Sequence, residues 1–368
     1  MPITVSTPHR SYAQERFIFV DHDGHDIRVI RERDFGSVWN GLRYRLTGEM
    51  STWYTLHSPP PFSRADLFHL YNGASLARRP WVTTVENWQF NRLGPIDRAG
   101  LLAGRPCRRI MAISNWVIDR FRERAVDFGY DDRIMAKVEL VPPPQALVPR
   151  QERDDDGRTR LCFVGSAFFR KGGLELLRAL ERLAPEELPL ELEIVSSLAT
   201  DAYPPGTEFG PEDVAEVHRL LERLGRSVRR HASLPNAQVL ELLGRSDVGV
   251  LPSFFDTYGF SVLEMMGAGL PMVVTNQRSL PELVTEERGW VLELPLDAHA
   301  TVDRTSAEKR RAVSELLVEQ LTEVLRRIAS APEEIRRRGA HAREYVHAVH
   351  DPARYAERLR RVYTEALS

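Results

Sequence analysis

Two carboxylates, one before and one after the start of a predicted helix that follows a glycine, are the clearest candidates for chemistry in this chain. In the segment 251–284, LPSFFDTYGFSVLEMMGAGLPMVVTNQRSLPELV, a strand-like run is followed by a loop that contains Asp256. Gly259 then leads into a predicted helix, and Glu264 lies just over one turn inside it. Carboxylates accept hydrogen bonds from the hydroxyls of a sugar ring. The segment therefore predicts two places where a hydroxylated ring is held.

The helix start between these carboxylates predicts an anion site. The first N–H groups of an α helix have no partner inside the helix, and the helix dipole is positive there. The backbone N–H groups of Phe260 and Ser261 therefore favour a phosphate. A ligand with a hydroxylated ring on each side of a diphosphate, a nucleotide sugar, suits both the phosphate seat and the two carboxylates.

A second segment, FVGSAFFRKGG at 163–173, also predicts phosphate binding. A strand-like run enters a turn at Gly165, and Arg170 and Lys171 come just before a predicted helix. Only three of the 50 basic residues are lysines, so a lysine at this place is notable. Cations at a helix start suit a phosphate, although the spacing of a P-loop is absent.

These segments resemble the retaining glycosyltransferases of family 4 (glycosyl transferases group 1), which have the GT-B fold. The likeness covers about 190 residues of the second half. It depends on an ordered set of motifs, because any one of them alone is weak. The motifs are FVGSAFFRKGG, SLPNAQVLELLGRSDVGVLPS, DTYGFSVLE and GAGLPMVVT.

The resemblance implies a role for each residue in these motifs. Glu264 corresponds to the residue that holds the ribose hydroxyls, and Lys171 to the one that holds the diphosphate with help from Arg170. Asp256 corresponds to the acidic residue that contacts the donor sugar, where the family usually has Glu. Ser166 stands where the family often has Arg.

Each of these residues also has a purely structural alternative. Glu264 could be an exposed helix carboxylate, Lys171 a solvated residue at a helix start, and Asp256 a helix cap.

The first half resembles the family only in outline, in HSPPPFSRADLFHLYN (57–72) and AISNWVIDRF (112–121). In TTVEN (83–87), Glu86 stands where the family commonly has a catalytic-site histidine, and we take it as a catalytic candidate. FIFVDHDGHDIRVI (17–30) places Asp23-Gly24 between two strand-like runs, a pattern typical of an antiparallel hairpin. We therefore expect an atypical first domain with a hairpin start.

The alternation of strand-like and helical runs in the second half predicts a parallel sheet with helices on both faces. The resemblance implies the whole architecture, an α/β protein of two facing Rossmann-like domains with parallel sheets. VPPPQALVPRQERDDDGR (141–158) reads as an exposed connector. We predict an acceptor-side domain at 1–145, a donor domain at 155–345, and a C-terminal helix at about 346–368 that packs back on the first domain.

Composition is that of an ordinary globular protein, with 42% apolar and 28% charged residues and a formal charge of −2. This balance argues against a nucleic-acid partner.

Cys107 and Cys162 cannot form a disulfide framework, and Cys162 lies in an apolar run typical of a buried thiol. With no leader or membrane span recognisable, we expect a cytoplasmic protein.

The Arg-rich stretch from Arg336 to Arg361 allows two interpretations. It is either the solvated face of helices that bury Tyr355, Leu359, Val362 and Leu367, or a surface for peripheral contact with the inner face of a membrane.

Other candidates have weaker support. His57 and His69 at strand ends are either catalytic or hydrogen-bonded parts of the structure. A metal site could be formed by the residues around the predicted turn, Asp21, His22, His25 and Asp26. Polar residues around a turn are usually solvated. We therefore predict no metal, and we also predict no cofactor.

The expected function is transfer of a sugar, with retention and without a metal, from a nucleotide-diphosphate sugar to a glycan, lipid-linked or small-molecule acceptor. Two alternatives stay open. One is a non-catalytic protein of the same fold that binds a nucleotide sugar or a partner glycosyltransferase. The other is an enzyme, such as an epimerase, that acts on the nucleotide sugar alone.

Overall fold

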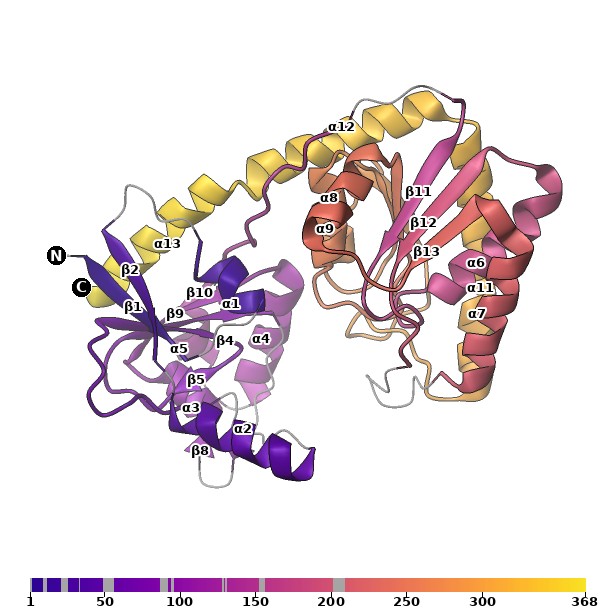
Figure 1. Ribbon diagram of the computed structural model, residues 1–368. Helices are drawn as coiled ribbons and strands as arrows, with labels where there is room; N and C mark the ends of the chain where they lie inside the picture. Colours follow the sequence, from indigo (N-terminus) through magenta and orange to yellow (C-terminus); the bar gives the residue numbers. More distant parts are fainter. Residues whose placement is uncertain are drawn as a thin grey trace. The chain divides into compact units, whose positions relative to one another are not determined.

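The computed structural model describes residues 2–8, 12–20, 26–32, 34–48, 56–86, 92–93, 96–127, 129, 131–151, 156–200 and 209–368. The chain divides into two compact units, which are described separately (Figure 1). Unit 1 contains residues 1–144 and 350–368, and unit 2 contains residues 145–349.

Unit 1 is built on a six-stranded sheet in the order β10-β9-β6-β4-β1-β2, in which every pairing is parallel. Its strands are β1 (Ile3–Thr7), β2 (Ile27–Arg31), β4 (Leu67–Tyr71), β6 (Trp81–Val85), β9 (Cys107–Ala112) and β10 (Val138–Leu140). Short strands β3 (Leu56–His57) with β5 (Ala74–Ser75), and β7 (Arg92–Leu93) with β8 (Ile96–Asp97), form two small pairs. Its helices are α1 (Tyr12–Phe17), α2 (Phe35–Thr47), α3 (Arg98–Ala103), α4 (Asn115–Asp127), α5 (Asp131–Met135) and α13 (Pro352–Leu367).

The predicted hairpin start of the first domain is wrong. β1 and β2 pair in parallel, from Ile3 opposite Ile27 onward, with α1 between them. Phe17 and Ile18, which the hairpin required as a strand, end α1 and follow it, and both are fully buried. Parallel neighbours need a crossover, and a helix provides it. The Asp23-Gly24 turn itself lies outside the described residues.

Unit 2 is built on a second parallel sheet, in the order β13-β12-β11-β14-β15-β16. Its strands are β11 (Thr159–Val164), β12 (Leu190–Val195), β13 (Val228–His231), β14 (Val248–Leu251), β15 (Met272–Thr275) and β16 (Gly289–Leu292). Its helices are α6 (Gly173–Leu183), α7 (Pro211–Leu224), α8 (Asn236–Arg245), α9 (Phe260–Gly267), α10 (Leu280–Leu283), α11 (Ala307–Ala329) and α12 (Pro332–Val349). The predicted α/β class with two parallel sheets is confirmed.

The helix α6 shows why this alternation forms. Its leucines Leu174, Leu177, Leu180 and Leu183 recur at helical spacing and are all buried. An amphipathic helix covers a parallel sheet with such a face. α6 is also in contact with α7 and α11, so its buried leucines contribute to the core of unit 2.

The strand order of unit 2 reverses at one defined place. From β11 the chain proceeds outward to β12 and β13, and it then returns to place β14 on the other side of β11. Ligands of open α/β sheets bind at the carboxyl ends of the strands where the order reverses in this way. The loops that follow β11 and β14 are therefore the expected site-forming loops.

The C-terminal helix α13 belongs to unit 1, where it contacts β4 and β9. Tyr355, Leu359 and Val362 are buried as predicted, but Leu367, at the end of the helix, is 38% exposed.

The predicted exposed connector is not exposed throughout, because Val141 and Val148 are buried. The N–H of Val141 donates to the carbonyl of Ala112 in unit 1, and that of Val148 donates to the carbonyl of Gly267 in unit 2. No helix in the described part of the chain is long and apolar enough to cross a membrane.

Candidate functional site

The two loops at the strand-order reversal of unit 2 are held together by their backbones. The N–H of Phe254, in the loop after β14, donates a hydrogen bond to the carbonyl of Arg170, in the loop after β11, at 2.9 Å. The next strand supports the same loop, because the hydroxyl of Thr275 donates to the carbonyl of Ser253 at 2.6 Å. The segments 165–172 and 252–259, both singled out by sequence, thus meet at one place.

An ion pair joins the side chains of these loops. Nζ of Lys171 lies 2.6 Å from Oδ2 of Asp256. The side chains are only 12% and 14% exposed, so water screens the pair less than it would on the surface. The resemblance implies separate roles for Lys171 and Asp256, and their contact could not be predicted, since 85 positions separate them.

Gly165 makes room for the lysine. A Cβ at this position would lie 2.5 Å from Cδ of Lys171 and 3.1 Å from its Cε. The backbone of Gly165 is fixed, because its N–H donates to the carbonyl of Val195 at 3.1 Å. The stem of Lys171 therefore passes across the end of β11, in space that a side chain at 165 would occupy.

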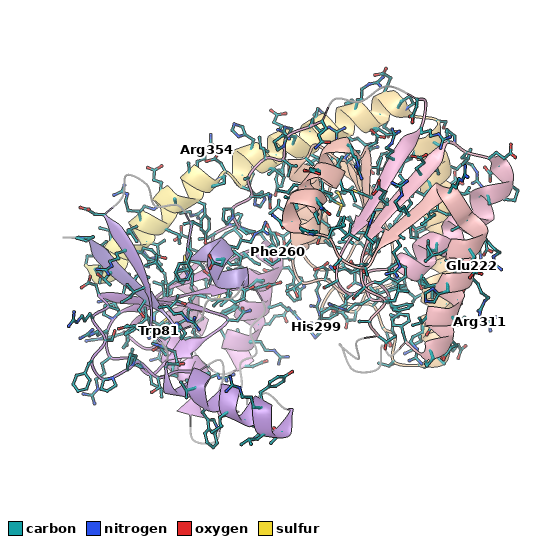
Figure 2. All side chains as sticks on the ribbon, viewed as in Figure 1. Trp81, Glu222, Phe260, His299, Arg311 and Arg354 are labelled. Carbon is teal, nitrogen blue, oxygen red and sulfur yellow. The ribbon has the colours of Figure 1, made fainter. Side chains whose placement is uncertain are left out.

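Helix α9 begins beside this ion pair. Gly259 precedes it with φ 92°, in the left-handed region that favours glycine, and a Cβ there would lie 2.7 Å from Leu280. Phe260, labelled in Figure 2, and Ser261 open the helix. Both residues are half-buried. Glu264, also half-buried, lies one turn further along. The predicted helix start with a carboxylate one turn inside is therefore present.

This arrangement suits a diphosphate flanked by hydroxyl-bearing groups. The positive end of α9 and the ammonium of Lys171 supply positive charge, while Asp256 and Glu264 supply hydrogen-bond acceptors. Among the described residues, no group of three His, Cys, Asp or Glu side chains is arranged to hold a metal ion.

Two arginines next to the Asp256 loop, the half-buried Arg278 and the buried Arg304, were not anticipated from sequence. The guanidinium of Arg278 lies 3.7 Å from the ring centre of Phe255, and that of Arg304 lies 3.8 Å from the ring centre of Phe254. Such stacking fixes the two phenylalanines that precede Asp256. No motif or periodicity links these residues, so the sequence held no signal for the contacts.

In unit 1, Glu86 lies at the carboxyl end of β6 and accepts a hydrogen bond from the hydroxyl of Tyr71. Its N–H donates to Oδ1 of Asn72 at 2.8 Å. Burial, followed by the negative charge of Glu86, raises the pKa of Tyr71 well above its ordinary value. Tyr71 therefore stays a neutral donor that orients the carboxylate, a partner that the sequence analysis missed.

The two histidines are hydrogen-bonded parts of the core of unit 1. His69 is fully buried and shares hydrogen bonds with the hydroxyls of Tyr363 at 2.6 Å and Thr84 at 2.8 Å. His57 is 3% exposed and shares one with the hydroxyl of Ser75 at 2.8 Å. These contacts favour the structural interpretation of both residues.

The other sequence candidates have different outcomes. Of the residues drawn as a metal site, Asp21, His22 and His25 lie outside the described residues. Several arginines of the 336–361 stretch are bound within the protein. Arg343 donates to the carbonyls of Val148 and Gly267, both at 2.7 Å. Arg358 pairs with a carboxylate of β10.

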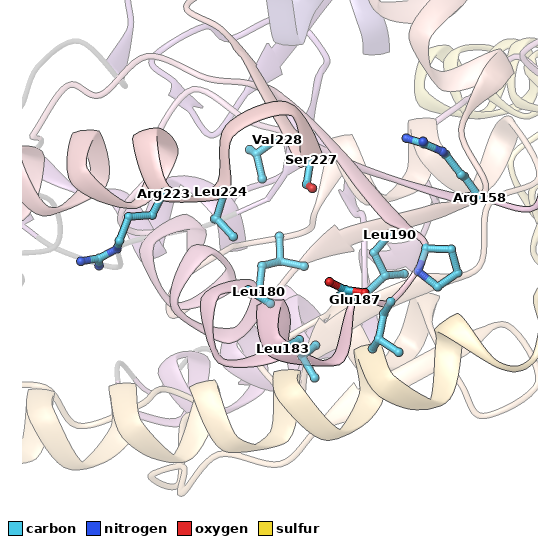
Figure 3. A pocket seen from close by; sticks show the side chains of 12 residues that line it. Arg158, Leu180, Leu183, Glu187, Leu190, Arg223, Leu224, Ser227 and Val228 are labelled. Carbon is cyan, nitrogen blue, oxygen red and sulfur yellow. The ribbon is translucent and has the colours of Figure 1, made fainter.

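A hollow of about 550 Å³ lies elsewhere in unit 2 (Figure 3). Leu190 and Val228, the first residues of β12 and β13, line it together with Leu183 near the end of α6. It is therefore at the amino ends of the strands, away from the loops that carry Lys171 and Asp256.

Comparisons with known proteins relate this chain to glycosyltransferases. Residues 158–307 match the family "Glycosyl transferases group 1". A glycogen synthase of Mycobacterium tuberculosis is 25% identical over 297 residues, which is 74% of this chain and 66% of the relative. An MMP alpha-(1->4)-mannosyltransferase of Mycolicibacterium hassiacum is 28% identical over 245 residues, 66% of this chain and 51% of the relative. The chain thus spans half to two thirds of the length of these relatives.

Among solved structures, HepE of Anabaena in complex with UDP matches 99% of this chain and 100% of its own, with a TM-score of 0.59 and 13% identity. At that identity the likeness concerns the fold, two Rossmann-like units of the GT-B type. The family match covers both loops that hold the Lys171–Asp256 pair. Over residues 158–307, the part that carries the candidate site, the chain is therefore similar to the group 1 glycosyl transferases.

Proposed function

We propose that this protein transfers a sugar from a nucleotide-diphosphate sugar to an acceptor hydroxyl, with retention of the anomeric configuration and without a catalytic metal. The observation that carries the proposal is the Lys171–Asp256 pair at the strand-order reversal. It lies between the loops that open α6 and α9, where a diphosphate meets both a cation and a helix start.

Unit 2 binds the donor. Lys171, with Arg170 from the same loop, holds the diphosphate, and the N–H groups of Phe260 and Ser261 support it. Glu264 accepts hydrogen bonds from the ribose hydroxyls, and Asp256 accepts them from the transferred sugar.

The same groups assist departure of the leaving group. When the bond between the sugar and the diphosphate breaks, the diphosphate gains negative charge. The ammonium of Lys171 and the positive end of α9 stabilise that charge more strongly in the transition state than in the bound donor. A fixed cation and a fixed dipole do this with little reorganisation, because Gly165 and the Asp256 contact already hold the lysine in place.

Unit 1 serves the acceptor. Glu86, oriented by Tyr71, is the carboxylate that we assign to the acceptor hydroxyl. The acceptor class is a glycan, a lipid-linked sugar or a small molecule. The named relatives are a glycogen synthase and a mannosyltransferase, and the fold relative is complexed with UDP, which makes UDP-sugars the first donors to test.

The experiment is a thermal-shift screen against nucleoside diphosphates and their sugars, followed by assay of the responding donors for nucleotide release. A ligand that binds only the folded protein raises the melting temperature. We expect one nucleotide class to do so and the matching sugar donor to be turned over when acceptors are supplied. Binding without turnover over long incubation would favour the non-catalytic alternative, and turnover of donor to an isomer without acceptor would favour an epimerase.

A further inference from the structure

Arg304 is a buried cation that lies against the loop of Asp256. It is 6% exposed, and its guanidinium lies 3.8 Å from the ring centre of Phe254 and 5.2 Å from that of Phe209. Its Nε and Nη1 atoms have no hydrogen-bond partner among the described residues. A buried cation with unpaired donors costs free energy on folding. Stability alone therefore gives no reason for a charge at this position.

The ring that Arg304 covers belongs to the residue at which the two site loops meet. The N–H of Phe254 donates to the carbonyl of Arg170, directly before Lys171, and Asp256 follows Phe254 by two positions. The place of Phe254 therefore sets where both partners of the ion pair lie. A cation–π contact holds this ring, and such a contact is strongest where both groups are out of water.

A buried carboxylate links Arg304 to helix α6. Glu175 lies in the first turn of α6, four positions after Lys171, and is 1% exposed. Burial raises the pKa of Glu175, and the charge of Arg304 is the largest influence that opposes this rise. Oε1 of Glu175 accepts a hydrogen bond from the hydroxyl of Ser314 on α11 at 2.7 Å. The attraction between Glu175 and Arg304 acts in surroundings that exclude water, where charges interact strongly.

We propose that Arg304 is a positioning residue for the Lys171–Asp256 pair. It attracts Glu175 at the start of α6 and holds the ring of Phe254, so the loops after β11 and β14 keep one distance from each other. This inference rests on the proposed function, because the task of the pair in donor binding and transfer comes from there.

The first experiment needs no ligand. Hydrogen exchange in the segment 252–259, followed by mass spectrometry, reports whether the Phe254 N–H keeps its bond to the Arg170 carbonyl. Arg304→Met should raise exchange in this segment about tenfold, because methionine covers the ring without a charge. Arg304→Lys, which keeps a cation there, should restore slow exchange.

Arg338→Met is the matched control. Arg338 is 7% exposed, and its guanidinium lies 4.8 Å from the ring centre of Trp290. It donates to the carbonyl of Gly289, the first residue of β16, so it lies at the amino end of a strand, away from the site loops. Arg338→Met also removes a buried arginine stacked on a ring, so it controls for lost stability. Exchange in 252–259 should stay as in the wild type.

Kinetics test the link to transfer. A displaced Asp256 loses its contact with the donor sugar and no longer offsets the charge of Lys171. Arg304→Met should therefore lower kcat about tenfold, while the affinity for a free nucleoside diphosphate stays equal or rises. General loss of structure would lower both quantities. In an Asp256→Asn background, Arg304→Met should lower kcat less than about twofold, because the residue through which it acts is already changed.

Three results would overturn the proposal. The first is equal exchange in 252–259 for Arg304→Met and the wild type, and the second is an equally large rise for Arg338→Met. The third is a full, additive loss of kcat when Arg304→Met is combined with Asp256→Asn. If the wild type transfers sugar from no donor, the proposed function fails instead, and hydrogen exchange still decides whether Arg304 holds the two loops together.

Discussion

Nζ of Lys171 lies 2.6 Å from Oδ2 of Asp256, although the two residues come from loops after different strands. The contact holds the ammonium at the carboxyl end of β11 and offsets part of its charge. A lysine ammonium has three donors, so it can hold Asp256 and still donate to a phosphate. Asp256 thus both positions the cation and moderates its attraction for anions.

This relationship predicts opposite effects of Asp256→Asn on binding and on transfer. Loss of the negative charge leaves Lys171 uncompensated, so the affinity for a free nucleoside diphosphate should rise about three- to tenfold. Loss of the carboxylate contact to the sugar should lower kcat at the same time. Calorimetric titration and steady-state kinetics measure the two quantities. Weaker diphosphate binding in this variant would contradict the moderating role.

Gly165→Ala is expected to act through Lys171. The added Cβ would meet the Cδ of Lys171 at 2.5 Å and displace the stem, which should lower kcat/KM about tenfold. If the effect passes through the lysine, Gly165→Ala should cost little more in a Lys171→Met background. Additive losses in this double-mutant cycle would show that the glycine matters for another reason.

Glu264→Gln should weaken nucleotide binding about tenfold, because an amide replaces the charged acceptor for the ribose hydroxyls. Glu241→Gln on the neighbouring helix α8 is the control, since this glutamate is exposed and distant from the α9 start in sequence. The readout is the dissociation constant of the nucleoside diphosphate identified in the screen. Equal dissociation constants for both variants would remove Glu264 from the site.

The variant Glu86→Gln should separate the role proposed for unit 1, acceptor chemistry, from the role proposed for unit 2, donor binding. This change keeps a hydrogen-bond acceptor for Tyr71 but removes the charge assigned to the acceptor reaction. We expect kcat to fall about a hundredfold while the dissociation constant of the nucleotide stays unchanged. If Glu86→Gln lowers nucleotide affinity instead, Glu86 does not act in the acceptor reaction alone and the assigned role is wrong.

Both thiols should be unreactive in the folded protein. Burial raises the pKa of Cys107 and of Cys162 to about 12, far above the value of about 8.5 in an unfolded chain. A thiol reagent at pH 8 should therefore react only as the chain unfolds. The raised pKa values also make stability depend on pH. Between about pH 8.5 and 12 the thiols are protonated in the folded chain and lose their protons on unfolding, so the free energy of unfolding should fall as the pH rises through this range. Cys162→Ala should make that fall shallower in denaturant titrations.

Much of unit 2 could be predicted from the sequence because its signals are local. The leucines of α6 repeat at helical spacing, and Gly259 with Glu264 marks the start of α9 within six positions. Such patterns state which element forms and which face is buried.

The long-range contacts could not be predicted in the same way. The Lys171–Asp256 pair and the stacking of Arg278 on Phe255 arise only when the sheet brings distant loops together. The hairpin error has a related cause. The run after Phe17 is apolar enough for a strand, yet Phe17 and Ile18 are used at the end of α1 because β1 already occupies the neighbouring strand position.

The central claim is that Lys171 holds the diphosphate of the donor. Its most direct test is calorimetric titration of the wild type, Lys171→Met and Lys309→Met with the nucleoside diphosphate found in the screen. Lys309 is the matched control, because it is also a lysine paired with an aspartate, Asp303, but is exposed on unit 2. We predict that Lys171→Met weakens binding at least about tenfold while Lys309→Met binds like the wild type. Equal affinity of Lys171→Met and the wild type would contradict the account.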